Sequence, residues 1–219
     1  MITYEQIKND AAVRAYIQAA DESLKALGFT EHSFAHVIKV AEDAEKILSA
    51  LGYNEREIEL AKIAAILHDI GNLVNRCDHS QSGAIMAYRL LDKLGMPPEE
   101  IATVVTAIGN HDEGTGVPVN AVSAALILAD KSDVRRTRVR NGDISTFDIH
   151  DRVNYSVEKS ELVISEKGKE IKLLLKIDTS ISSVMDYFEI FLQRMMLCRK
   201  AAERLGMSFS LVINDQKLL

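Results

Sequence analysis

Apolar residues in the first 140 positions recur every three or four residues, which is the period of an amphipathic helix. Several of these stretches, and a later one that ends near residue 205, close with a Leu-Gly pair, as expected where glycine takes a left-handed conformation just past a helix. The pairs are Leu27-Gly28, Leu51-Gly52, Leu94-Gly95 and Leu205-Gly206. The pattern predicts helices at about residues 4–27, 33–51, 55–70, 81–94, 97–110 and 120–137.

The spacing of the apolar residues becomes shorter after residue 140. Two apolar runs between Val153 and Ile177 flank Gly168, which predicts a β-hairpin with a glycine-containing turn. Helical spacing then predicts a helix at about 180–205, and Ser208 to Ile213 is predicted as a strand. We therefore expect a mainly α protein: a helical domain over residues 1–140, and a small α+β appendage (β-β-α-β) over residues 141–219.

Composition narrows the classes of protein that fit. The chain is 47% apolar and 26% charged, which is typical of a folded globular protein and not of a disordered one. Because aromatics are only 5% and Trp is absent, aliphatic side chains must build the core, which favours helices. The net charge of −6 argues against a nucleic-acid partner.

The chain shows no export signal and no apolar run long enough for a membrane span, so no membrane partner is expected. Its two cysteines, Cys77 and Cys198, lack the spacing of a metal-binding pair and are too few for a disulfide scaffold. We expect a cytoplasmic protein. The apolar stripe of the 180–205 helix is interpreted as core, and a homodimer seam is the alternative.

Four histidines and two aspartates stand where the predicted helices begin, end or cross the core. Each has an ordinary structural interpretation, such as a helix cap, a core hydrogen bond or a salt bridge. Asp130 is the strongest signal, because it follows six small or apolar residues and a buried carboxylate needs a partner. Together these residues form a ligand set for divalent metals. The candidates are His36, His68, Asp69, His79, His111 and Asp130.

The order of these residues, with His68-Asp69 adjacent, resembles the HD superfamily of metal-dependent phosphohydrolases over about residues 30–140. The resemblance implies that the first histidine, the His-Asp pair and the distal aspartate hold one metal. The two intervening histidines would hold a second metal, bridged by Asp69. The segments around His79, His111 and Asp130 are most similar to the branch that cleaves dinucleoside tetraphosphates symmetrically.

The ligand set suits two divalent ions, with iron, manganese, nickel, zinc and magnesium all compatible. Two such ions would lower the pKa of a shared water, and the bridging hydroxide would attack phosphorus. Asp69 would orient the pair of ions, and Asp112 or Glu113 could relay a proton to the leaving group.

Basic residues follow Asp130 on the same predicted helix. Lys131, Arg135 and Arg138 are spaced as one helical stripe, which predicts a grip on substrate phosphates. Lys131 and Arg135, nearest the metal ligand, are also expected to act in catalysis. The alternative is a favourable interaction of these cations with the helix C-terminus. His32, one turn before His36, is a candidate for substrate contact or for capping.

We therefore expect a hydrolase of phosphoesters or phosphoanhydrides in a small phosphorylated molecule, such as a nucleotide. Two alternatives stay open. HD proteins that resemble mixed-valent di-iron oxygenases use the same six ligands for oxygen chemistry, and a non-catalytic module could use the same site to sense a nucleotide.

Overall fold

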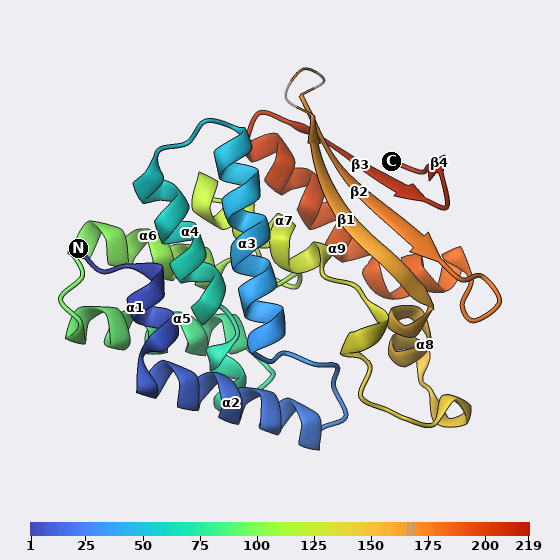
Figure 1. The fold of residues 1–219 in the computed structure, drawn as a ribbon, viewed down its shortest axis with the longest axis horizontal. Coiled ribbons are helices and arrows are strands. Elements are labelled where there is room, and N and C mark those ends of the chain that lie inside the picture. Colours follow the sequence, from blue (N-terminus) through green and yellow to red (C-terminus); the bar gives the residue numbers. More distant parts are fainter. Residues whose placement is uncertain (166, 168) are drawn as a thin grey trace.

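The computed structural model describes residues 1–165, 167 and 169–219. A bundle of helices forms one side of the molecule, and a sheet with one long helix behind it forms the other (Figure 1). The helices of the described residues are α1 (Tyr4–Asn9), α2 (Ala11–Ala26), α3 (Phe34–Ala50), α4 (Glu55–Leu67), α5 (His79–Lys93), α6 (Pro98–Gly109), α7 (Ala121–Ser132), α8 (Ile149–Ser156) and α9 (Val184–Arg204). The 3-10 helices and strands are η1 (Ile70–Leu73), η2 (Arg136–Arg138), η3 (Ile144–Thr146), β1 (Val157–Ser165), β2 (Glu170–Ile177), β3 (Ser208–Ile213) and β4 (Gln216–Lys217).

Local signals explain where the helices begin and end. The glycines of all four Leu-Gly pairs have positive φ, between +72° for Gly206 and +82° for Gly28, so the predicted helix ends are confirmed. The predicted helix at 4–27 is instead two helices. Asp10 has extended backbone (φ −65°, ψ 129°), and its side chain accepts hydrogen bonds from the first turn of α2.

Two helices form the centre of the bundle. In α4, every residue from Leu60 to Leu67 except Lys62 is buried, and in α7 every residue from Val122 to Ser132 is buried. Helix α3 packs against both of them. Side chains at the ends of these helices are therefore held in the interior, away from bulk water.

The C-terminal segment forms a sheet in the order β1-β2-β3-β4, with β1 antiparallel to β2 and β2 parallel to β3. Helix α9 connects the two parallel strands and packs against α7. One apolar core runs from the bundle into the sheet and includes both Leu128 and Leu211. The predicted mainly α fold with a small α+β C-terminal part is confirmed, and the division at residue 140 stays a prediction.

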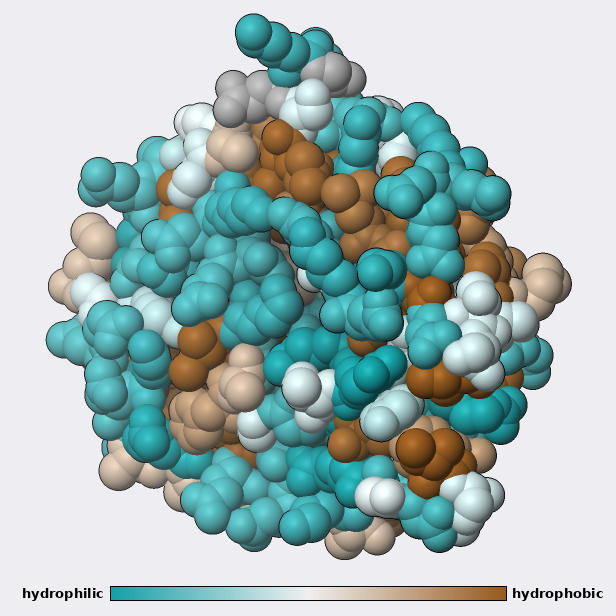
Figure 2. All heavy atoms as spheres, turned by 45° about the vertical axis from the view of Figure 1, so that its right-hand side comes forward, coloured by the Kyte–Doolittle hydropathy of each residue, from teal (hydrophilic) through white to brown (hydrophobic). Residues whose placement is uncertain are grey.

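The hairpin differs from the prediction in one detail, because residues 153–156 belong to α8 and β1 begins at Val157. The predicted turn residue Gly168 lies outside the described residues. On the face that Figure 2 shows, hydrophilic side chains prevail and apolar ones gather in separate patches. No helix in the described ranges is both long and apolar enough to cross a membrane.

One prediction is wrong in a way that bears on the site. Helix α7 ends at Ser132 and not near residue 137, because Asp133 leaves the helical conformation (φ −80°, ψ 72°). Arg135 is then extended (φ −157°, ψ 148°), and Arg138 lies in η2. Lys131, Arg135 and Arg138 therefore do not form one helical stripe.

Candidate metal centre

The structure brings all six sequence-predicted metal ligands together at the centre of the bundle. They come from the first turns of α3 and α5, from the ends of α4 and α6, and from α7. All six are buried, with exposed fractions from 0% to 9%. They are His36, His68, Asp69, His79, His111 and Asp130.

The four imidazole rings share one orientation, in which Nδ1 faces a hydrogen-bond acceptor and Nε2 faces the centre of the cluster. For three of them the acceptor is the backbone carbonyl three residues earlier. The acceptors are Asp133 Oδ2 for His36 (2.8 Å), Ala65 O for His68 (2.7 Å), Arg76 O for His79 (3.1 Å) and Ile108 O for His111 (2.6 Å). Because Nδ1 donates in each case, the neutral form of each ring carries its lone pair on Nε2, which is the form that binds a metal ion.

The carboxylate of Asp69 lies between two pairs of histidines. Its Oδ2 is 3.1 Å from Nε2 of His68 and 3.6 Å from Nε2 of His36. Its Oδ1 is 3.6 Å from Nε2 of His79 and 4.0 Å from Nε2 of His111. A carboxylate with one oxygen toward each pair has the arrangement of a bridging ligand.

Asp130 completes the first of these groups. Its Oδ1 is 3.3 Å from Nε2 of His36 and 3.7 Å from Nε2 of His68. Its Oδ2 is instead 2.7 Å from Nζ of Lys131. The lysine thus fixes the carboxylate so that one oxygen faces the histidines.

The polar atoms of this cluster fit a bound cation. Nε2 of His36 and Nε2 of His68 are buried without a hydrogen-bond partner, which is costly unless a ligand satisfies them. Nε2 of His79 and Nε2 of His111 are 3.2 Å apart, and two lone pairs at that distance repel unless a positive charge lies beside them. Nitrogen and carboxylate donors together suit transition metals such as manganese, iron, nickel and zinc.

Charge within the cluster compensates for burial. Burial would lower the pKa of His68, but Asp69 and Asp130 beside it raise that pKa above its usual value. Burial would likewise raise the pKa of Asp130, but Lys131, His36 and His68 hold it well below the usual range. The aspartates are therefore ionised and ready to coordinate a cation.

The predicted basic residues are not all at the centre. Lys131 is buried between Asp130 and Glu113, with Nζ 2.7 Å from a carboxylate oxygen of each. Arg138 is buried and lines the cavity beside the cluster. Arg135 is not among the residues that line that cavity; its Nε is 2.7 Å from Oδ1 of Asp133.

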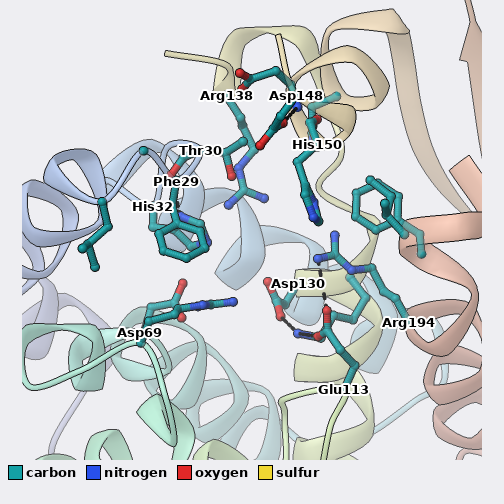
Figure 3. Close-up of a pocket in the computed structure, with 18 of the residues that line it drawn as sticks. Phe29, Thr30, His32, Asp69, Glu113, Asp130, Arg138, Asp148, His150 and Arg194 are labelled. Carbon is teal, nitrogen blue, oxygen red and sulfur yellow. Dashed lines mark hydrogen bonds and ion pairs between the residues drawn. The ribbon is translucent and has the colours of Figure 1, made fainter. Parts of the chain in front are cut away.

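A cavity of about 360 Å³ opens beside the cluster, with Asp69, His111 and Asp130 in its lining (Figure 3). Its walls include residues that the sequence did not single out, among them Arg194 on α9. His150, to which the sequence assigned no role, also lines it, as does His32. Arg194 gave no sequence signal because it lies on a separate element far along the chain from Asp130.

The chain is similar to a family profile and to proteins of known sequence. A sequence profile described as the HD domain matches residues 33–152. An uncharacterized protein of Methanocaldococcus jannaschii is 26% identical over 208 residues, covering 84% of this chain and 80% of the relative. Ribonuclease Y of Bacillus pumilus is 26% identical over 159 residues, covering 69% of this chain, which spans only 28% of that relative.

Among solved structures, a predicted HD superfamily hydrolase from an uncultured Thermotogales bacterium is 27% identical. The TM-score of this match is 0.43, and the match covers 60% of this chain and 73% of the hydrolase chain.

Proposed function

The chain belongs to the HD domain family, and on that premise we propose that it is a metal-dependent phosphohydrolase acting on a small, nucleotide-like molecule. The observation that carries the proposal is the position of Asp69, with one carboxylate oxygen toward His36 and His68 and the other toward His79 and His111. This geometry supports two adjacent cations that share one carboxylate.

His36, His68, Asp69 and Asp130 would hold the first cation, and His79, His111 and Asp69 the second. When bound, such ions lower the pKa of water and stabilise the phosphoryl oxygens of an in-line displacement.

The surrounding side chains position the ligands and limit access. Lys131 holds Oδ2 of Asp130, so that Oδ1 faces His36 and His68. Asp133 accepts the Nδ1 hydrogen of His36 and fixes the direction of its ring. Because the six ligands are buried, water and substrate reach them through the cavity.

The cavity supports a small substrate. Its volume of about 360 Å³ is at the lower end for small-molecule sites, which run from about 300 to 1,000 Å³. Arg76, Arg138 and Arg194 line it and supply positive charge for phosphate oxygens.

The proposal is tested by elemental analysis of protein purified without chelators, together with phosphate release across a panel of nucleotides. We expect about two divalent cations per chain and release from particular nucleotides. His68→Ala and Asp130→Asn should each lose metal and reduce turnover by at least about 100-fold, because each removes a ligand. Asp215→Asn, on the exposed β3–β4 turn, serves as the control and should change neither quantity.

Full metal content in both ligand variants would contradict the assignment of the site. Two irons per chain without phosphate release from any nucleotide would contradict hydrolysis and favour the di-iron oxygenase alternative.

A further inference from the structure

The C-terminal segment forms one wall of the cavity that reaches the metal ligands. Arg194 and Phe191 on α9, and Asn154 on α8, line it opposite the ligands supplied by the bundle. Residues 191 and 194 lie beyond the part of the chain that matches the HD domain. This wall therefore lies outside the matched domain.

Arg194 enters the cavity with its charge only partly compensated. Its Nη2 is 3.3 Å from Oε1 of Glu113, while its buried Nε has no hydrogen-bond partner. The guanidinium packs over the ring of Phe191, with its carbon 4.2 Å from the ring centroid. The other oxygen of Glu113 is 2.7 Å from Nζ of Lys131. One carboxylate therefore forms ion pairs with two basic side chains, Lys131 and Arg194.

Arg138 reaches the same cavity from η2 and is held rigidly. Its Nε donates to the carbonyl of Glu31 (2.8 Å) and its Nη1 to the carbonyl of Asp133 (2.7 Å). The carboxylate nearest to it, Oδ2 of Asp133, is 3.8 Å away and already accepts from His36. No hydrogen bond donated by its Nη2 is found within the described part of the chain, so this nitrogen is available to a ligand.

The two arginines face one space. Figure 3 shows Arg138, His150 and Arg194 pointing into the gap above Asp130. Burial lowers the pKa of Arg138; Asp133 and Asp130 oppose this shift, and the positive charge of Arg194 adds to it. The two like-charged side chains therefore repel each other across the gap. An anion between them would remove that repulsion and satisfy the free donors.

Where the lining of the cavity is exposed, it includes carboxylates as well as the half-buried Arg76. Asp148 lines the cavity and is exposed, and Asp151 lies beside it and is half-buried. These carboxylates disfavour a long polyanion that would have to extend out of the cavity. A compact ligand with its negative charge inside fits this arrangement better than a nucleic-acid strand.

We propose that Arg138 and Arg194 bind a second phosphate of the substrate, so that the site takes small phosphoanhydrides in preference to phosphomonoesters. This inference rests on the proposed hydrolytic function. In the reaction, a water oxygen forms a bond to the phosphorus beside Asp69, the bridging P–O bond breaks, and one proton is released. The leaving phosphate keeps the bonding electron pair, and the two guanidinium groups neutralise the charge that develops on it.

The test compares two ligands that differ by one phosphonate group. Methylenediphosphonate, which has carbon in place of the bridging oxygen, and methylphosphonate are titrated calorimetrically into the metal-loaded protein. We expect the diphosphonate to bind at least about tenfold more tightly to the wild-type protein, because it gains charge-assisted hydrogen bonds to both arginines. Arg194→Gln and Arg138→Gln should each reduce that preference to about threefold or less.

Arg199→Gln is the matched control, since Arg199 is an exposed arginine on the same helix, and the preference should persist in it. Arg194→Lys retains the charge and should keep part of the preference, which guards against a variant that simply fails to fold. Metal content is measured on every variant to separate loss of the anion subsite from loss of the metal centre.

Equal preference in wild type and both glutamine variants would overturn the proposal, as would an equal loss of affinity for both ligands. If the preference depends on both arginines but no phosphate compound is hydrolysed, the anion subsite holds and the hydrolytic function fails. The two proposals are thus distinguished by separate readouts.

Discussion

At the scale of single residues, Asp133 is the side chain that ties the basic segment after α7 to the metal ligands. Its Oδ2 accepts from Nδ1 of His36 at 2.8 Å, and its Oδ1 accepts from Nε of Arg135 at 2.7 Å. Burial would raise its pKa, but His36, Arg138 and Arg135 hold that pKa well below the usual range. Asp133 is therefore a charged partner that increases the basicity of a metal-binding histidine.

We expect Asp133→Asn to weaken metal binding by about 10- to 100-fold, because the neutral amide supports His36 less strongly than the carboxylate does. Competition with a fluorescent chelator measures the affinity. Asp143→Asn, which alters an exposed aspartate that caps η3 far from the ligands, should leave it unchanged. Unaltered affinity in the Asp133 variant would show that the orientation of His36 does not depend on this charge.

At the scale of elements, the contact between η1 and α5 sets the distance between His68-Asp69 and His79. Gly71 in η1 makes this approach possible: a Cβ there would lie 1.9 Å from the carbonyl oxygen of His79 and 2.5 Å from the backbone nitrogen of Gly83. Both atoms belong to the backbone of α5, so the contact cannot relax by a side-chain rotation.

Gly71→Ala should therefore force η1 and α5 apart, lowering the free energy of unfolding by about 1–3 kcal/mol and weakening metal binding. Urea denaturation with and without added metal measures both effects. Gly142→Ala is the control, because nothing lies within 4 Å of a Cβ at that position. A Gly71 variant as stable as the control would contradict the close approach of the two elements.

At the scale of the whole molecule, α9 packs against the bundle and forms one wall of the cavity. Cys198 on α9 is 1% exposed, whereas Cys77, near the start of α5, is exposed. Burial raises the pKa of Cys198 to about 12, so its thiol is neutral as well as shielded at ordinary pH.

A chromogenic disulfide reagent at about pH 8 should therefore label one thiol in the native protein and both in guanidinium chloride. In Cys77→Ser the native protein should react negligibly and the denatured protein should react once. Rapid labelling of Cys198 in the native variant would mean that α9 leaves the bundle, and the wall carrying Arg194 with it.

The sequence by itself determined most of the helices, the strands β1 to β3 and the six candidate metal ligands, but it gave no sign of α8 or β4. Helix ends at Leu-Gly pairs depend on the local conformation of glycine, and the burial of Asp130 follows from the apolar run before it. Such signals are contained in a few neighbouring residues, so they can be recognised without knowing the fold. The end of α7 was misjudged, because Asp133 leaves the helix in favour of a partner, His36, on a distant element.

Only the tertiary structure decided which side chains face one another at the metal centre and which ones line the cavity. Each carboxylate oxygen of Asp69 faces a different pair of histidines. Arg135 lies outside the lining of the cavity, whereas Arg194 is part of it. These relations depend on the packing of α9 on α7 and of η1 on α5. The physical reason is that distances between residues far apart in the chain are set by core packing, which no local pattern of hydrophobic and polar positions records.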